Sequence, residues 1–441
     1  MIRHPNSREE QSLFHDPVRA ATLLRDIFAN ERARIGFFIG AGCPVSVRCD
    51  DEEGATRPLI PDIKGLTSKV REQISEKYSN ELNIIDGISV ELGRPTNNIE
   101  HTLSIIRSHI EIVGSGTIRG LDHQMLQNID QAICSYIRMI TSVKLPDADS
   151  GYRAIAQWIE GLERTNPVEI FTTNYDLLLE QALETNRLTY FDGFTGADRP
   201  FFNLSAIERD SLPAFWTRLW KLHGSINWSE NQDGNTVHRY TLENESKSLP
   251  ISSHGSLIYP SHRKYDQSRR LPYLALIDRL KIFLRKQSSV LVVSGYSFGD
   301  AHLNEVIIDS LESNPTALCF SLAFGNMNDH KILRQYAERR SNLTVFAYDS
   351  GVIGRKFGKW CTNDQQNLDS LRNIFERRSP DDTSDSSESE QSNDEATAKE
   401  PLTTPPNSAH YGCRIADFKS LGEFLIDVSG SFNQVERAAR A

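Results

Sequence analysis

The chain has 441 residues, of which 38% are hydrophobic and 24% are charged. This length exceeds what one hydrophobic core usually supports, so it predicts one large domain with appendages or two domains. No apolar run approaches the roughly 18 residues that cross a bilayer, and the polar N-terminus lacks the apolar core of a signal peptide. We therefore expect no membrane span and a cytoplasmic protein.

The cysteines and the charges narrow the class further. Six cysteines are scattered without a Cys-x-x-Cys pair, so neither a disulfide framework nor a zinc site is expected, and no metal is predicted. The net charge is -10, but residues 381–400 hold eight acidic residues and one lysine, which leaves the rest close to neutral. We interpret the basic stretch from His262 to Arg270 as a solvated loop, so nucleic acid is expected to take part only indirectly if at all.

Helix and strand patterns alternate along most of the chain. Asp16 and Pro17 predict the start of a first helix, and the continuous apolar run Ile35–Ile39 predicts a strand buried on both faces. A helical region of about residues 62–165 follows. Its helices are expected at Ile63–Lys77, Asn98–Ile112, Leu121–Val143 and Tyr152–Arg164.

The second half alternates short apolar runs with helical stretches. The runs predict strands at Val168–Thr172, Leu219–Leu222, Leu257–Tyr259, Val290–Ser294, Ala317–Leu322 and Leu343–Tyr348. Helices are expected at Tyr175–Glu184, Leu271–Lys286, Asp300–Leu311 and His330–Arg339. This alternation predicts an α/β fold with a doubly wound, Rossmann-like, mainly parallel sheet and a helical insertion or layer.

The composition changes abruptly after Arg378. Residues 379–409 are too poor in apolar side chains to offset their ordering entropy, so they are predicted to form a disordered acidic linker. Residues 410–441 carry helix-spaced apolar side chains in a segment too short to fold alone. We expect a C-terminal helical tail that docks on the same chain or on another, and residues 1–378 form the main domain.

Ligands of doubly wound sheets bind outside the carboxyl ends of the strands, so the residues after each predicted strand are candidates. Gly40, Ala41 and Gly42 follow the first strand. Small residues there permit a tight reversal of the chain, or they let backbone N–H groups approach a pyrophosphate. After the strand Val290–Ser294, Asp300 suits a helix N-cap, while Ser294, Gly295 and Ser297 are candidates for contacts with phosphate or ribose oxygens.

Two further strand ends carry polar side chains. Asn174 and Asp176 follow Val168–Thr172; either residue suits a helix cap, or Asn174 binds a sugar hydroxyl and a water while Asp176 orients an amide. His223 and Gly224 follow Leu219–Leu222. This histidine is either a structural residue or a base that removes a proton from a ribose hydroxyl or a water, since imidazole titrates near neutrality.

In chain order, these motifs resemble the signature series of the sirtuin superfamily over roughly residues 18–350. The series is Gly40-Ala41-Gly42, Thr173-Asn174-Tyr175-Asp176, His223-Gly224 and Gly295-Tyr296-Ser297. Ile60-Pro61-Asp62 is similar to the family's Ile-Pro-Asp element, although residues 43–59 separate it from the glycine turn. The sequence Thr172-Thr173-Asn174-Tyr175-Asp176 resembles that of bacterial sirtuin-like effectors of anti-phage defence. Classical sirtuins carry a four-cysteine zinc module, and its absence from this sequence argues against protein deacylation.

The resemblance implies that residues 1–378 form a sirtuin-like catalytic domain for which NAD is the substrate. It implies an NAD+ hydrolase (NADase) that releases nicotinamide and ADP-ribose, with Asn174 and His223 as the catalytic residues. The implied NAD-binding residues are Gly40, Ala41, Gly42, Asp62, Thr173, Asp176, Ser294, Gly295 and Ser297. It also implies a homo-oligomer and a HerA-type hexameric ATPase as partner. The apolar pattern of the C-terminal tail makes that tail a candidate assembly element. The alternatives are an NAD-dependent deacylase or ADP-ribosyl transferase, and a non-catalytic sensor of NAD or ADP-ribose.

Overall fold

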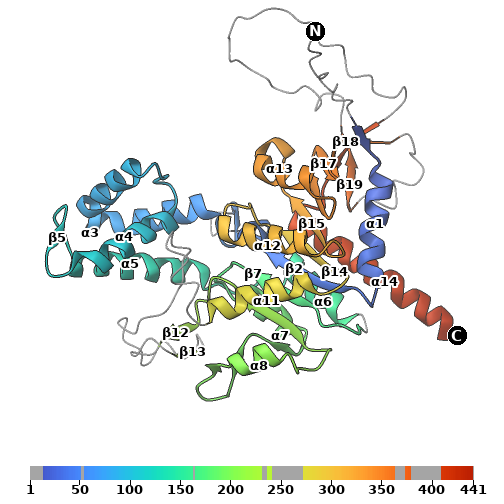
Figure 1. The fold of residues 1–441 in the computed structure, drawn as a ribbon, viewed down its shortest axis with the longest axis horizontal. Coiled ribbons are helices and arrows are strands. Elements are labelled where there is room, and N and C mark those ends of the chain that lie inside the picture. The colour runs from blue at the N-terminus through green and yellow to red at the C-terminus, as the bar shows by residue number, and fades with distance from the viewer. Residues whose placement is uncertain are drawn as a thin grey trace, which may run out of the picture.

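A 12-stranded, mainly parallel sheet forms the centre of the computed structural model (Figure 1), which describes residues 13–50, 54–161, 164–230, 236–240, 272–362, 373–378 and 409–440. The strands lie in the order β19-β20-β18-β17-β16-β15-β14-β2-β7-β11-β8, and β1 pairs with β18. Neighbouring strands from β16 to β8 are parallel. The parallel strands are β2 (Arg34–Ile39), β7 (Glu169–Thr172), β8 (Tyr190–Phe191), β11 (Thr217–Lys221), β14 (Ser289–Ser294), β15 (Leu318–Ala323) and β16 (Leu343–Ala347).

The strand order confirms the predicted doubly wound α/β fold. After β2 the chain supplies β7, β8 and β11 on one side of the sheet, with β11 placed between β7 and β8. It then crosses over to add β14, β15 and β16 on the other side. The direction of winding therefore reverses between β2 and β14. Ligands of such sheets bind at the carboxyl ends of the strands that flank this switch point.

Both faces of the sheet are covered, because successive residues of a buried strand point to opposite faces. Phe37 packs into one core with helices α1 (Pro17–Ala29), α6 (Gly151–Glu160), α7 (Leu178–Thr185) and α14 (Phe418–Arg440). Phe38 packs into the other with α8 (Leu204–Arg209), α11 (Tyr273–Arg285), α12 (Ala301–Ser313) and α13 (Lys331–Arg339). The apolar runs of the sequence thus become strands buried on both sides.

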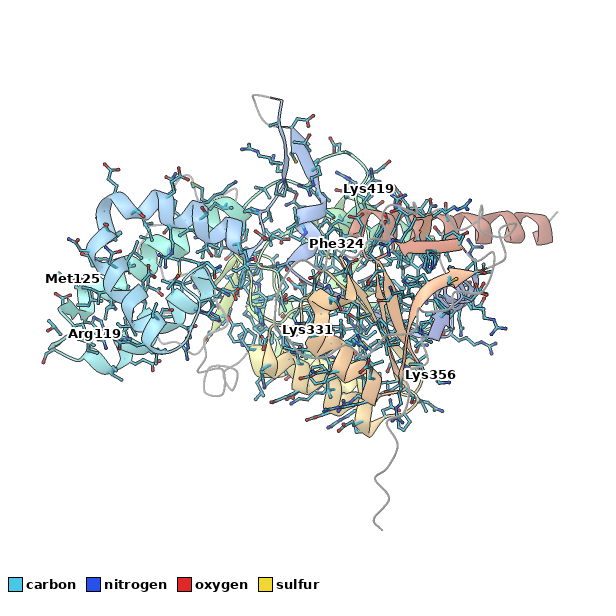
Figure 2. The ribbon with its side chains drawn as sticks, turned by 90° about the horizontal axis from the view of Figure 1, so that it is seen from above. Arg119, Met125, Phe324, Lys331, Lys356 and Lys419 are labelled. Carbon is cyan, nitrogen blue, oxygen red and sulfur yellow. The ribbon has the colours of Figure 1, made fainter. Side chains whose placement is uncertain are left out.

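Three helices form a separate layer beside the sheet. They are α3 (Ile63–Glu91), α4 (Ile99–Val113) and α5 (His123–Thr141), and their apolar side chains make a core of their own. Tyr175 and Ile226, which follow two strands of the main sheet, join this core. Figure 2 shows Arg119 and Met125 at the end of the layer that lies farthest from the sheet. The layer therefore meets the sheet at the carboxyl ends of β7 and β11.

Two expectations for the helical region need adjustment. Helix α3 runs beyond the expected end at Lys77 to Glu91, through a kink at Tyr78, whose φ and ψ are -124° and 25°. Helix α6 packs against α1 and α14 over the sheet instead of joining the layer. The helical layer proper therefore ends with α5 at Thr141.

The C-terminal segment docks on its own chain. Strand β20 (Ala409–Cys413) lies between β18 (Lys356–Thr362) and β19 (Phe375–Arg377), and it pairs antiparallel with both. Helix α14 follows, and Phe424 packs edge-on against Phe28 of α1 with ring centroids 5.8 Å apart. The tail expected to be helical thus also supplies a strand. The expected strand Leu257–Tyr259, the basic stretch 262–270 and residues 379–408 of the linker lie outside the described residues.

The remaining elements are short. They are β1 (Leu13–His15), α2 (Gly42–Ser46), β3 (Arg48–Asp50), β4 (Thr56–Pro58), β5 (Thr117–Ile118), β6 (Leu121–Asp122), β9 (Phe194–Thr195), β10 (Phe201–Phe202), β12 (Trp228–Glu230), β13 (Val237–Arg239), β17 (Ser350–Ile353) and the 3-10 turn Met327–His330. Strand β17 makes an antiparallel hairpin with β18, which extends the parallel sheet at its β16 side. Within the described ranges, no helix has the length and apolar character that a membrane span requires.

Candidate active site

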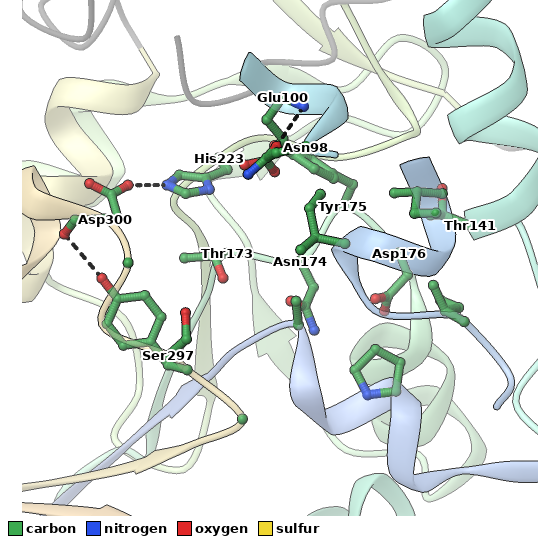
Figure 3. Close-up of a pocket in the computed structure, with 18 of the residues that line it drawn as sticks. Asn98, Glu100, Thr141, Thr173, Asn174, Tyr175, Asp176, His223, Ser297 and Asp300 are labelled. Atoms are coloured by element: carbon green, nitrogen blue, oxygen red, sulfur yellow. Dashed lines mark hydrogen bonds and ion pairs between the residues drawn. The ribbon is translucent and has the colours of Figure 1, made fainter. Parts of the chain in front are cut away.

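A pocket of about 590 Å³ lies at the switch point of the sheet (Figure 3). The residues that follow β7, β11 and β14 line one side, and the first turns of α3 and α4 line the other. The sheet side carries Thr173, Asn174, Tyr175, Asp176, His223, Gly295, Tyr296 and Ser297. The structure thus brings most of the sequence-predicted site residues into one cavity, whose size falls within the usual range for small-molecule sites.

Asn174 is fixed by two hydrogen bonds. Its side-chain nitrogen Nδ2 donates to the carbonyl oxygen of Gly40 at 3.1 Å, and its backbone N–H donates to Oγ1 of Thr172 at 3.0 Å. The Thr172 hydroxyl in turn donates to the carbonyl of Ile39 at 2.8 Å. Asn174 is 7% exposed. It therefore does not cap α7; it joins the end of β7 to the loop after β2.

The two glycine loops pack backbone to backbone. The N–H of Gly40 donates to the carbonyl of Ser294 at 2.9 Å, and the N–H of Gly42 donates to the carbonyl of Gly295 at 2.8 Å. Gly295 has φ +66°, and a Cβ there would lie 2.6 Å from the nitrogen of Cys43. These glycines are therefore needed for the close approach of the two loops, and the N–H groups of Gly40 and Gly42 are already satisfied within the protein.

Asp176 lies at the other end of the pocket, above a buried ion pair. Its carboxylate accepts from the N–H of Leu178 at 3.0 Å, which satisfies the start of α7 as the capping interpretation expects. The ammonium of Lys221 donates to the backbone carbonyl of Asp176 and, at 2.9 Å, to the carboxylate of Glu180. Burial raises the pKa of Asp176 and that of Glu180, and the charge of Lys221 opposes both shifts. Burial thus makes proton uptake easier for a carboxyl that faces the pocket.

His223 is paired with Asp300 across the pocket. Its Nε2 lies 3.2 Å from Oδ2 of Asp300, and the two side chains are 14% and 9% exposed (Figure 3). Gly224 has φ +92°, which allows the chain to turn directly after the histidine. The hydroxyl of Tyr296 donates to the backbone carbonyl of Asp300 at 3.2 Å. A histidine from one half of the sheet and an acidic residue from the other half therefore meet at the site.

Four predicted residues do not line the pocket directly. Gly40 and the fully buried Ser294 lie in the contact between the two glycine loops, where the thiol of Cys43 donates to the Ser294 carbonyl at 3.3 Å. Gly42 belongs to the same contact but is exposed. Asp62 caps α3, and its exposed side chain accepts from the N–H of Gly65 at 2.8 Å. Its neighbours in the predicted Ile-Pro-Asp element line the pocket instead of Asp62 itself.

The helical layer supplies a wall that sequence reasoning missed. Its pocket-lining residues are Ile63, Leu66, Asn98, Glu100, His101 and Thr141. Asn98 caps α4 by accepting from the N–H of Glu100 at 2.9 Å. An asparagine before an apolar helix is a recognisable cap in the sequence, but nothing near it indicates that the cap faces a pocket. On the sheet side, Tyr175, Tyr296 and Asp300 were not selected as site residues either.

The comparisons with known proteins bear on the same part of the chain. Residues 168–345 match the family model described as a SIR2-like domain. No curated protein matches the sequence. Among solved structures, a Sir2 enzyme has 13% identity and a TM-score of 0.35, with 72% of this chain and 89% of that chain covered.

Two further structures are similar to this chain. A Sir2 homologue in complex with NAD has 13% identity and a TM-score of 0.38, with 73% of this chain and 89% of that chain covered. A mutant Sir2 homologue in complex with 2'-O-acetyl ADP-ribose has 14% identity and a TM-score of 0.34, with coverages of 69% and 84%. The segment that carries Asn174, His223 and Asp300 thus matches the SIR2-like domain family.

Proposed function

We propose that this chain is an NAD+ glycohydrolase that cleaves the bond between nicotinamide and ribose. The observation that carries the proposal is the meeting of Asn174 and His223, from neighbouring parallel strands β7 and β11, in one pocket at the switch point. The match of this segment to the SIR2-like domain supports NAD as the substrate. A pocket for phosphate alone requires neither an amide nor an imidazole at these places.

The proposed chemistry needs positioning more than acid catalysis. The bond between nicotinamide and C1' of the ribose breaks with its electron pair, so nicotinamide leaves as a neutral molecule and needs no proton. Asn174 orients the ribose and a water, and His223 takes a proton from that water as its oxygen bonds to C1'. The products are nicotinamide, ADP-ribose and one proton. Asp176, whose pKa is raised by burial, faces the carboxamide end of the substrate.

Water is the preferred acceptor in this proposal. In classical sirtuins a four-cysteine zinc module helps to form the groove for acyl-lysine, and this chain lacks the paired cysteines of that module. Helices α3 and α4 wall its pocket instead. Deacylation and ADP-ribosyl transfer both require a second substrate. Nicotinamide release that depends on an acylated peptide or a protein acceptor would therefore favour them over hydrolysis.

The test is chromatography of NAD incubated with the purified chain and with its variants. Removing a general base costs on the order of 100- to 10,000-fold in rate, so His223→Ala and Asn174→Ala should each nearly abolish nicotinamide release. His109→Ala is the matched control, because His109 contacts the Ile105 carbonyl within α4 and lies outside the pocket. Parent-like turnover by both site variants would refute the assignment.

We further propose that the activity serves anti-phage defence within a regulated assembly. An enzyme that drains NAD harms its host unless it is held silent, so we expect release by a partner, an oligomer rearrangement or a phage signal. The resemblance stated above implies a homo-oligomer and a HerA-type hexameric ATPase. NAD turnover, measured with and without the ATPase encoded beside this protein in the genome, tests the proposed regulation. Fast NAD turnover by the isolated chain would contradict it. NAD binding without turnover in every mixture would favour a sensor.

A further inference from the structure

Asp300 is held more firmly than a helix cap alone requires. Its Oδ1 accepts from the N–H groups of His302 and Leu303 at 3.0 and 3.3 Å, which caps α12. Its backbone carbonyl accepts from the hydroxyl of Tyr296 at 3.2 Å and from the N–H of Asn304 at 2.9 Å. The carboxylate therefore has one oxygen committed to the helix, while the other, Oδ2, is aimed at His223.

The surroundings of Tyr296 add to this rigidity. The single hydroxyl proton of Tyr296 is shared between the Asp300 carbonyl and Oδ1 of Asn304, which lies closer, at 2.8 Å. Nδ2 of Asn304 donates to the carbonyl of Phe298 at 2.7 Å. The ring of Tyr296 packs against Phe38 of β2 with centroids 4.7 Å apart. The turn between β14 and α12 is thus tied to the central strand of the sheet, and Asp300 is fixed relative to β11.

We propose that Asp300 is a positioning residue that sets the orientation and the tautomer of His223 for NAD hydrolysis. At 3.2 Å a carboxylate oxygen would repel the bare lone pair of an unprotonated Nε2, so we infer that Nε2 carries the ring proton. In neutral imidazole the other nitrogen, Nδ1, is then the acceptor and the base. This inference rests on the proposed function for its chemistry, while the pairing itself rests on the 3.2 Å contact between His223 and Asp300.

The proton balance follows from this pairing. As the water oxygen bonds to C1' and the bond to nicotinamide breaks, the water proton moves to Nδ1 of His223. The imidazolium so formed keeps its Nε2 proton and lies against the negative charge of Asp300, which stabilises it. The proton then passes to solvent and restores the neutral ring. Asp300 itself neither gains nor loses a proton in the cycle.

Other titratable groups share the pocket and bear on any pH profile. They are Glu100 and His101 of α4, Tyr175 and Asp176 after β7, Tyr296 after β14, and His302 and Glu305 of α12. Tyr175 also lies beside the imidazole of His223, with ring centroids 6.5 Å apart, whereas Asp300 brings a carboxylate oxygen to within 3.2 Å of Nε2. A substitution at Asp300 is therefore expected to act on the rate through His223 and not through these other groups.

The decisive variant is Asp300→Asn, because asparagine is as good an N-cap as aspartate and its oxygen still accepts from His302 and Leu303. Its NH2 group would face Nε2 and select the opposite tautomer, with the proton on Nδ1. We expect kcat to fall by about 100- to 10,000-fold with little change in KM, as for other inverted histidine tautomers. Asp16→Asn is the matched control, since Asp16 caps α1 by accepting from Val18 far from the pocket.

Two further measurements separate positioning from folding. In a chain that already carries His223→Ala, Asp300→Asn should cause no additional loss of rate, because the two residues act as one unit. Nitrogen NMR of a histidine-labelled sample should show Nε2 of His223 protonated in the parent and Nδ1 protonated in Asp300→Asn. The melting temperature should stay close to that of the Asp16→Asn control.

The outcomes distinguish this inference from the proposed function. Parent-like kcat in Asp300→Asn, or the same His223 tautomer in both proteins, overturns the role of Asp300. If the parent does not hydrolyse NAD under any condition, the proposed function fails, and the NMR comparison still decides whether Asp300 sets the histidine ring. Additive rate losses in the double variant also overturn the inference, since they show that the residues act separately.

Discussion

The side-chain amide of Asn174 donates to the carbonyl oxygen of Gly40 at 3.1 Å, which links the end of β7 to the loop after β2. The bond is buried, so its loss leaves a carbonyl without a donor in a site that water reaches poorly. The same amide faces the pocket. One side chain therefore both fixes the loop geometry and presents a polar group to the substrate.

Asn174→Asp should separate shape from hydrogen bonding. The carboxylate keeps the size of the side chain but places an oxygen against the Gly40 carbonyl, so we expect a loss of about 1–3 kcal/mol of stability and of about 100-fold or more in rate. Asn186→Asp is the control, because Asn186 donates to the Ala182 carbonyl at 2.9 Å away from the pocket. Urea unfolding and NAD turnover measure both effects. Equal rates in the two variants would contradict the site role.

Gly295→Ala should damage the contact between the two glycine loops at the pocket. The residue has φ +66°, and the added Cβ would meet the backbone nitrogen of Cys43 at 2.6 Å. Gly354→Ala carries only the backbone cost, of about 1–2 kcal/mol, since φ is +56° there and no atom lies within 4 Å. We expect a clearly lower melting temperature for Gly295→Ala than for Gly354→Ala. Similar melting temperatures of the two variants would mean that the loops after β2 and β14 can move apart without loss of stability.

Asp176→Asn should change how stability depends on pH. Burial raises the pKa of Asp176 in the folded state, whereas the unfolded value is about 3.9. Its contribution to stability is therefore fully present below about pH 3.9 and is lost as the pH rises through the folded pKa. The asparagine keeps an acceptor for Leu178 and does not titrate. Relative to this variant, the parent should lose unfolding free energy as the pH rises above about 3.9. Parallel profiles of the two proteins would disprove the raised pKa.

Deleting residues 379–441 should unfold the main domain instead of only releasing an assembly element. The deletion removes β20 from between β18 and β19, and it strips α14 from the apolar faces of α1 and α6. We expect a marked fall in melting temperature or insoluble protein. An internal deletion of residues 383–404 keeps both elements and should melt like the parent. A truncated chain that melts like the parent would show that the docked tail adds no stability.

Much of the fold could be predicted because parallel strands buried on both faces produce unbroken apolar runs. The runs at β2, β7, β11, β14, β15 and β16 are of this kind, and each lies within about a residue or two of its expected place. The hairpin of β17 and β18 was not predicted, since its exposed positions break the run. Strand β20 was missed because it depends on partners from other parts of the chain.

Part of the site could be predicted because the positions of the strands could be predicted. Asn174 and His223 follow strands, so topology alone brings them to one edge. Glu100 and His101 come from a helix whose packing against the sheet depends on Tyr175 and Ile226, and no local pattern reveals that contact. The pairing of Asp300 with His223 likewise joins residues that are distant in sequence, and a helix cap was the only role visible from its neighbours.

The late position of α14 has a consequence for synthesis. A ribosome delivers the pocket residues, which end at Glu305, well before it delivers Phe418 and the rest of the helix that covers α1 and α6. During that interval the nascent chain exposes an apolar surface of the kind that chaperones and proteases recognise. Chains interrupted before α14 are therefore open to removal. For an enzyme proposed to consume NAD, α14 thus acts as a check against chains that were interrupted before it.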